Sequence, residues 1–239
     1  VYFAFQIYGD FSGYSDIAIG TAKLFGIQLM TNFKTPYFSR DIAEFWRRWH
    51  ISLSTWFRDY LYIPLGGSRV GKWKSVRNVF VIFLVSGFWH GANWTFIVWG
   101  GIHAALFLPL LLRGKNRRYT SDTIGEGRWL PTGREFLGMA WTFSMVCVAW
   151  VFFRAASVSE AIQYIAHASN PEGFFNAPQK VSYTACVSIL SLIVGDWMVK
   201  SGSMPRRWNA PAFTAVRWGM ASMGIWFILK HFASQANFI

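Results

Sequence analysis

The stretch SGFWHGANWTFIVWGGIH, Ser86–His103, decides how the rest of the chain can fold. It lies inside the run 78–112, which contains no formally charged side chain, and it places His90 among tryptophans and glycines. An ionisable group in so apolar a setting is costly and indicates a functional site. A histidine that only hydrogen-bonds to a neighbouring helix would leave the same pattern, so the run alone leaves both interpretations open.

The composition is typical of an integral membrane protein. Of the 239 residues, 53% are hydrophobic and 14% are charged, whereas a soluble domain has about 25% charged residues. The formal net charge is +12, but the basic residues cluster between apolar runs, as the positive-inside rule expects, and no nucleic-acid recognition motif accompanies them. The two cysteines lie in separate apolar runs. We therefore expect no nucleic-acid partner, no disulfide framework and no metal site.

The length of the run 78–112 predicts a helical hairpin. It is too long for one span, which needs about 20 residues, and slightly short for two. A hairpin that turns near residues 90–93 puts every basic loop on the cytoplasmic side, whereas a single span would export the basic segment 113–118. His90 then lies at a break between half-helices, which is tolerated at membrane depth only against protein or a cavity.

The predicted fold is all-α, a polytopic membrane protein with about six spanning helices and additional amphipathic helices in the membrane interface. Because the chain begins in mid-hydrophobic sequence without an initiator methionine, we expect residues 1–239 to form one membrane-embedded domain that is truncated at its N-terminus. The predicted spans are residues 1–30, 78–90, 93–112, 136–153, 181–199 and 213–232, and the predicted interfacial helices are residues 39–62 and 157–168.

The first interfacial helix combines an apolar face with a basic face. Ser39 or Asp41 can cap its start, and at 100° per residue Glu44 and the arginines fall opposite the aromatic residues. His50 falls at the border of the apolar face. A border histidine is usually only an interfacial residue, so its placement alone does not single it out.

The first predicted span carries two aspartates, Asp10 and Asp16. Both are too polar to face lipid, so they are expected to face protein or a water-filled cavity. The alternative is that they only bond to neighbouring helices.

Three motifs carry a resemblance to a known family. They are YGDFSGYSDIAIGTAKLFGI (8–27), NFKTPYFSRDIAEFWRRWHISLSTWFRDYLYIPLGG (32–67) and GFWHGANWTFIVWGGIH (87–103), with a weaker match in FFRAASVSEAIQYI (152–165). In this order they resemble the membrane-bound O-acyltransferases, in their bacterial alginate O-acetyltransferase-like branch. The resemblance implies that His90 is the catalytic base and that His50 is a second catalytic residue, which positions a substrate or a carrier arm.

The resemblance also implies a reaction and a location. An acetyl group would pass from a cytoplasmic donor, acetyl-CoA or another acetyl thioester, to a hydroxyl acceptor for polysaccharide O-acetylation, with no bound cofactor. Membrane lipid, a polysaccharide acceptor and a periplasmic acetyl-accepting or acetyl-delivering protein are the expected partners of a multi-pass protein of the bacterial inner membrane. Asn93 or the Gly91 backbone N–H would stabilise the oxyanion. The expected substrate-binding residues are Trp49, Trp89, Asn93, Trp94, Asp10 and Asp16.

Three other interpretations stay open. A transporter or channel would use the buried aspartates and move substrate without a covalent acyl step. A scaffold for a synthase complex would not need His50 or His90. Within the enzyme interpretation, a D-alanyl-transferring relative is the nearest alternative to an acetyltransferase.

Overall fold

The computed structural model describes residues 1–120, 124–125, 128–170 and 183–200. The predicted span 213–232 and the first two residues of the predicted span 181–199 lie outside the described residues. All regular elements of the described part are helical, in agreement with the predicted fold class. Two of its helices, Trp94–Leu112 and Gly133–Arg154, are long and apolar enough to cross a membrane, and Ala185–Met198 is a shorter apolar segment. The number of about six spans remains a prediction.

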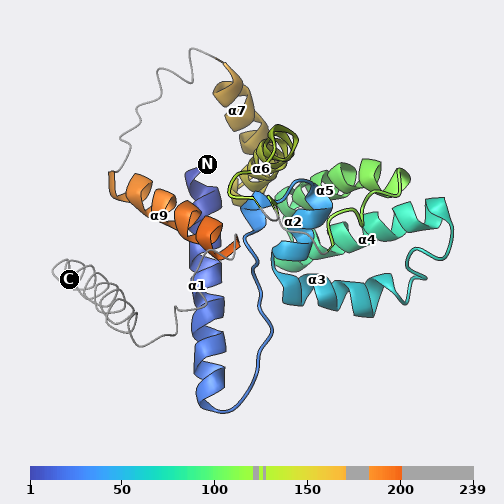
Figure 1. Ribbon diagram of the computed structural model, residues 1–239. Coiled ribbons are helices and arrows are strands. Elements are labelled where there is room, and N and C mark those ends of the chain that lie inside the picture. Colours follow the sequence, from blue (N-terminus) through green and yellow to red (C-terminus); the bar gives the residue numbers. More distant parts are fainter. Residues whose placement is uncertain (121–123, 126–127, 171–182, 201–239) are drawn as a thin grey trace, which may run out of the picture.

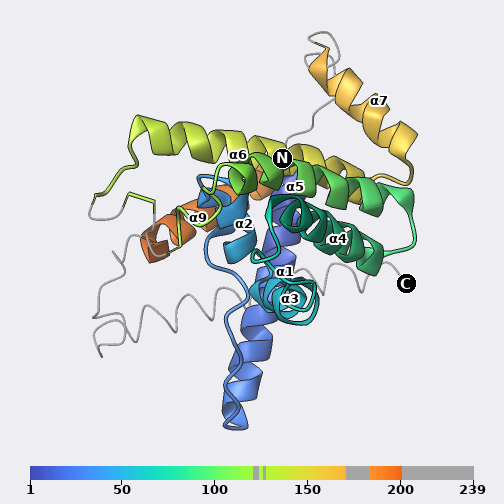
Figure 2. The same cartoon turned by 90° about the vertical axis from the view of Figure 1, so that its right-hand side faces the viewer.

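Figures 1 and 2 show how the helices are arranged. The long helix α1 (Tyr2–Leu24) is contacted near its N-terminal end by α9 (Tyr183–Lys200). On the other side, α4 (Lys72–His90) and α5 (Trp94–Leu112) lie side by side, and α6 (Gly133–Arg154) packs across α5. The short helices η1 (Pro36–Phe38) and α2 (Ile42–Arg48) pack against α6 and α5, respectively.

The helical turn expected near residues 90–93 is present: α4 ends at His90, α5 begins at Trp94, and the two helices pack along their lengths. Of the two, α5 is long and apolar enough to cross a membrane, and a spanning role for α4 stays a prediction. Glycines permit the close approach. A Cβ atom on Gly87 of α4 would clash with the backbone carbonyl of Phe96, and a Cβ on Gly100 of α5 would clash with that of Phe83. The two backbones therefore touch at two levels, where no other residue fits.

The predicted interfacial helix 39–62 is not continuous. The structure divides it into α2, α3 (Ile51–Phe57) and the π-helical turn η2 (Arg58–Tyr62), with a sharp break at Trp49 and His50. Asp41 caps α2 by accepting a hydrogen bond from the backbone N–H of Glu44, as predicted. Glu44, which the helical periodicity places opposite the aromatic residues, is buried: its side chain is 1% exposed and pairs with both Arg40 and Arg48. Two guanidinium groups compensate the buried carboxylate, which the helical periodicity does not reveal.

The other predicted boundaries shift by a few residues. Helix α1 ends at Leu24 rather than residue 30, because Gly26 adopts a left-handed conformation with φ of 73°. Helix α6 begins with a capping box between Thr132 and Glu135. Helix α7 (Val158–Ser169), capped by Ser157, matches the predicted segment 157–168 closely.

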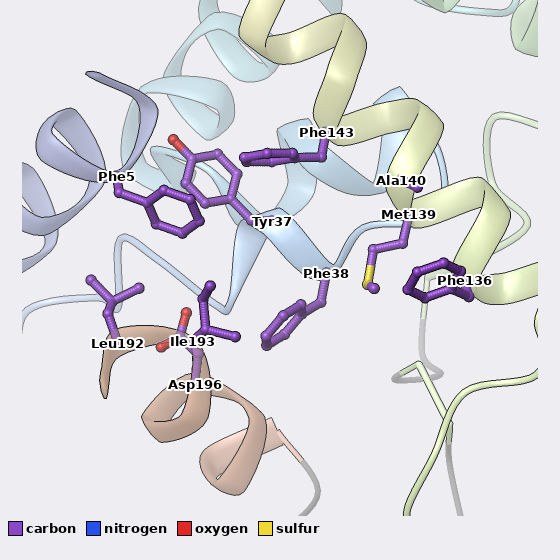
Figure 3. A pocket seen from close by; sticks show the side chains of 10 residues that line it. All are labelled: Phe5, Tyr37, Phe38, Phe136, Met139, Ala140, Phe143, Leu192, Ile193 and Asp196. Carbon is purple, nitrogen blue, oxygen red and sulfur yellow. The ribbon is translucent and has the colours of Figure 1, made fainter. Parts of the chain in front are cut away.

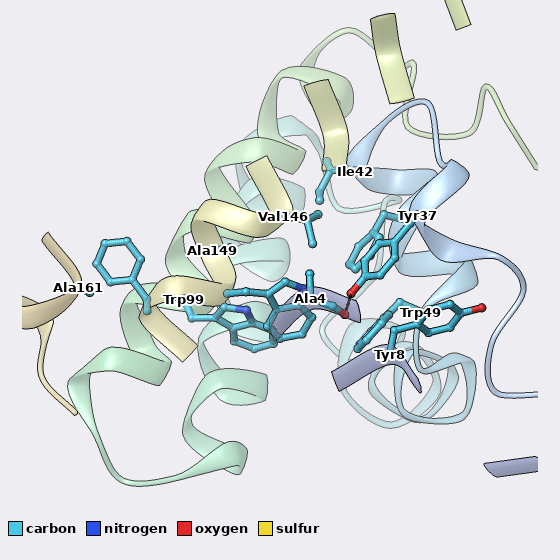
Figure 4. Close-up of a cluster of buried hydrophobic side chains, with 12 residues drawn as sticks. Ala4, Tyr8, Tyr37, Ile42, Trp49, Trp99, Val146, Ala149 and Ala161 are labelled. Carbon is cyan, nitrogen blue, oxygen red and sulfur yellow. Dashed lines mark hydrogen bonds between the residues drawn. The ribbon is translucent and has the colours of Figure 1, made fainter. Parts of the chain in front are cut away.

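Aromatic side chains from five elements meet in the core shown in Figure 4. Tyr37 of η1 and Trp49, which follows α2, pack on Tyr8 of α1. Trp99 of α5 stacks on Trp150 of α6 at 5.9 Å between ring centroids. This core joins the two helix breaks, at His50 and at residues 91–93, through one continuous set of rings.

Adjacent glycines of α5 provide a test of the close packing. Gly100→Ala is expected to destabilise the protein by about 1–3 kcal/mol, because its new methyl group meets the backbone of α4. Gly101→Ala is the matched control, since its Cβ would lie 4.0 Å from the nearest Leu84 atom in ordinary contact. Thermal unfolding of both variants in detergent checks this. Equal midpoints for the two variants would contradict the described packing.

Candidate functional site

His50 occupies the break between α2 and α3. Its backbone is left-handed, with φ 46° and ψ 56°, a conformation that costs a residue with a Cβ atom about 1–2 kcal/mol. The extended segment around Asn32 stabilises this conformation. The Ile51 N–H donates to the Asn32 carbonyl oxygen at 3.0 Å, and the Lys34 N–H donates to the Arg48 carbonyl at 3.0 Å. Strain of this kind concentrates at functional sites, where the surrounding structure holds it.

The His50 ring is held at one nitrogen and free at the other. Its Nδ1 lies 3.3 Å from Asn32 Oδ1 and 3.4 Å from Ser52 Oγ. The ring also packs edge-on against Phe11 of α1, at 4.6 Å between centroids. Its Nε2 has no hydrogen-bond partner among the described residues. A lone pair or a proton at that nitrogen is therefore available to a bound molecule.

His90 is the last residue of α4, and its imidazole lies among aromatic rings. Trp99 and Phe153 approach it edge-on at 5.3 and 5.0 Å, and Phe96 lies at 6.2 Å. Gly91 is required next to it, because a Cβ there would overlap the Phe96 ring. Neither ring nitrogen of His90 has a hydrogen-bond partner in the described part of the chain, although the side chain is only half-buried.

The fold brings the two histidines together. Burial, and to a smaller extent the neighbouring His90 imidazole, lowers the pKa of His50 to about 4. A row of packed aromatic rings, which we call the wall, connects the surroundings of the two histidines. The ring centroids of Trp49 and Trp150 are 5.2 Å apart, and those of Trp150 and Phe153 are 5.1 Å apart. Two breaks separated by forty residues in the sequence therefore contribute one imidazole each to a common, largely apolar region. The two rings make no hydrogen bond to each other among the described residues.

The proposed oxyanion donors of the sequence analysis are both engaged in structural bonds. Asn93 caps α5 by accepting from the Thr95 N–H at 3.0 Å, and its Nδ2 donates to the Ala156 carbonyl at 3.2 Å. The Gly91 N–H donates to the Phe88 carbonyl at 3.1 Å. Asn93 therefore ties the hairpin to the segment between α6 and α7 in this structure.

The other sequence-predicted site residues are distributed differently. Trp49 is buried, at 3% exposure, in the wall between the two histidines. Trp89 and Trp94 flank the hairpin turn and are 60% and 75% exposed. Asp10 and Asp16 are exposed residues of α1, and neither hydrogen-bonds to either imidazole in the described part.

Three residues next to the site were not predicted from the sequence to belong to it. His103 is completely buried, and its Nδ1 accepts a hydrogen bond from Trp46 Nε1 at 3.3 Å. Trp99 lies between His90 and His103, and its indole N–H has no hydrogen-bond partner among the described residues. The spacing of four between Trp99 and His103 places both on one face of α5 and was the available signal. Asn32 had no local signal, because its role depends on a contact across 18 residues.

A separate cavity lies between α1, η1, α6 and α9 (Figure 3). Its volume is about 240 Å³, and its lining is apolar except for Asp196. Neither His50 nor His90 lines it, so it is distinct from the histidine site. Within the described residues, no group of three histidine, cysteine, aspartate or glutamate side chains is arranged to hold a metal ion.

The structure thus defines a membrane-type helical protein with two imidazoles at converging helix breaks. The sequence model of the MBOAT, membrane-bound O-acyltransferase family, matches residues 1–152, so the chain belongs to this family. The chain is 49% identical over 156 residues to a probable alginate O-acetylase, AlgI, of Pseudomonas putida, covering 65% of this chain and 30% of the relative.

Two further relatives are named for different activities. A peptidoglycan O-acetyltransferase of Helicobacter pylori is 44% identical over 163 residues, covering 68% of this chain and 29% of the relative. A teichoic acid D-alanyltransferase of Bacillus subtilis is 34% identical over 161 residues, covering 63% of this chain and 39% of the relative. The chain spans less than two fifths of the length of the relatives named here.

The lowered pKa of His50 predicts its titration. The folded pKa of about 4 lies below the ordinary value of 6.5, so the unfolded chain binds more protons between these values. The contribution of neutral His50 to stability is therefore present at neutral pH and decreases as the pH falls from about 6.5 towards about 4. NMR of ¹⁵N-histidine-labelled protein, assigned with His50→Gln, should place the His50 midpoint near 4. A midpoint near the ordinary value would contradict the burial of this ring.

Proposed function

We propose that the protein is an O-acyltransferase, most specifically an O-acetyltransferase, in which His90 is the general base and His50 is a second catalytic residue. The observation that carries this proposal is that two imidazoles border one set of packed aromatic rings, and that each has a ring nitrogen without a hydrogen-bond partner among the described residues. An apolar setting keeps an imidazole neutral at physiological pH, and a neutral imidazole can take a proton from a hydroxyl group.

The proposed step is acyl transfer from a thioester. His90 takes the proton of the acceptor hydroxyl while the hydroxyl oxygen attacks the carbonyl carbon of the donor. The C–S bond then breaks, the thiolate leaves and takes up the proton from His90, and an ester is formed. Since Asn93 and the Gly91 N–H are engaged elsewhere, the unpartnered indole N–H of Trp99 is a further donor for the oxyanion.

The aromatic residues fit the role of substrate contacts. Trp49 lines the wall between the histidines, whereas Trp89 and Trp94 are exposed beside the hairpin turn, where a donor or an acceptor would enter. Asp10 and Asp16 remain proposed substrate-binding residues on α1. In membrane proteins, such exposed carboxylates are expected to face protein or a water-filled path.

The relatives favour acetyl transfer over D-alanyl transfer. The alginate and peptidoglycan O-acetylating relatives are 49% and 44% identical to this chain, compared with 34% for the D-alanyltransferase. We therefore propose that a multi-pass protein of the bacterial inner membrane takes acetyl groups from cytoplasmic acetyl-CoA or another acetyl thioester. The acceptor is an extracytoplasmic polysaccharide, reached directly or through a periplasmic partner protein.

His90→Ala in the full-length protein tests the proposal. Acetylation should fall by about 10²–10⁴-fold, because the general base is lost, while the amount of protein in the membrane is unchanged. The readout is acetate released by mild base from the polysaccharide of cells that express each variant. His167→Ala, which removes an exposed histidine of α7, is the matched control and should acetylate normally.

Labelled donor separates the remaining alternatives. An acetyltransferase moves label from an acetyl thioester to a base-labile ester only when His90 is present, and a D-alanyltransferase does so only with a D-alanyl donor. Undiminished acetylation by His90→Ala would refute the enzymatic role of this residue. Movement of an intact substrate without ester formation would identify a transporter.

A further inference from the structure

Asn32 lies at the centre of a hydrogen-bond network around His50. Its side-chain oxygen Oδ1 accepts from the Ser52 backbone N–H at 3.1 Å and from the Ser52 hydroxyl at 2.9 Å. Its Nδ2 donates to Ser15 Oγ of α1 at 3.4 Å. Since a backbone N–H can only donate, the atom facing Ser52 must be the amide oxygen, which fixes the orientation of the Asn32 side chain.

This orientation determines where His50 carries its proton. The third group at Asn32 Oδ1 is His50 Nδ1, at 3.3 Å. Because an amide oxygen only accepts hydrogen bonds, Nδ1 must bear a hydrogen atom. The neutral ring then has its lone pair on Nε2, the nitrogen without a partner in the described part of the chain. Burial favours the neutral ring, since it lowers the pKa of His50.

Within the described part of the chain, the groups that contact the His50 ring are uncharged. Helix α1 contributes the Phe11 ring and, through Asn32, Ser15; helix α3 contributes Ser52. The titratable group that acts on His50 is His90 of α4. No carboxylate in this set competes with Asn32 for Nδ1–H. The Ser52 hydroxyl, 3.4 Å from Nδ1, donates its proton to Asn32 Oδ1 and can therefore only accept from the ring, so it favours the same tautomer.

We propose that Asn32 is a positioning residue that holds His50 as its Nδ1–H tautomer, so that Nε2 presents a lone pair to the His90 site and accepts a hydrogen bond from the substrate. This inference rests on the proposed acyltransferase function and specifies the part of His50 in it. By accepting this hydrogen bond, Nε2 orients the hydroxyl-bearing molecule that receives the acyl group beside His90. A neutral His50 in this tautomer has no proton on Nε2 to give to a leaving group.

Asn32→Asp in the full-length protein tests the proposal through the pH profile of acetylation. The substitution keeps the shape of the side chain and its acceptor oxygen, but its negative charge stabilises the protonated ring. Because acceptance at Nε2 requires the neutral ring, the acid limb of kcat/KM should move to higher pH by about one unit or more. Gln163→Glu, which places the same charge on the exposed face of α7, should leave the profile unchanged.

A second pair of variants is independent of the folding of Asn32→Asp. In His50→Asn, the amide nitrogen can donate to Asn32 in place of Nδ1–H, but no atom takes the place of Nε2. In His50→Gln, the longer side chain can bring an amide oxygen to the position of Nε2. Acetylation by His50→Gln should exceed that by His50→Asn by about tenfold or more, the ratio expected from one hydrogen bond to substrate.

Failure of the inference is distinguishable from failure of the proposed function. If His90→Ala abolishes acetylation while Asn32→Asp and wild type share one pH profile, the role of Asn32 is refuted and the acyltransferase stands. Equal activities of His50→Gln and His50→Asn would likewise refute the acceptor role of Nε2. If Asn32→Asp does not accumulate in the membrane, the comparison of the two His50 variants decides.

Discussion

The left-handed turn at His50 is the constraint on which the site depends. A helix that continued from α2 into α3 would carry the imidazole on its surface, at the border of an apolar face. The break instead turns the ring between Asn32, Ser52 and Phe11. Backbone hydrogen bonds from Ile51 and Lys34 hold the turn in place, so the conformational strain of one residue is offset by the segment that also fixes its side chain.

The second break depends on close helix packing together with the hydrogen bonds of Asn93. Gly87 and Gly100 let α4 and α5 touch along their backbones, which brings His90 at the end of α4 beneath Trp99 and Phe153. Asn93 caps α5 and also ties the turn to Ala156. The hairpin is therefore held at its tip and along its length. Both imidazoles lie where a helix is interrupted, His50 between α2 and α3 and His90 at the end of α4.

The features that depend on composition and on charge could be predicted from the sequence. The charge-free run and the distribution of basic loops predicted the hairpin at His90, and local capping signals predicted the starts of α2 and α7. The break at His50 could not be predicted from the helical spacing of 3.6 residues, because the apolar pattern of the segment 39–62 continues through it. The buried position of Glu44 was also missed, since its compensation by Arg40 and Arg48 leaves the amphipathic pattern intact. Asn32 depends on a contact between segments, which no local pattern reports.

The central claim, that two helix breaks bring His50 and His90 to one site, is tested most directly by a cryo-electron microscopy structure of the full-length protein in lipid nanodiscs. The account predicts a left-handed His50 with Nδ1 on Asn32 Oδ1, and with Nε2 and the His90 ring open to the same cavity. A continuous helix through residues 42–62, or either imidazole facing lipid without a path from the membrane surface, would contradict it.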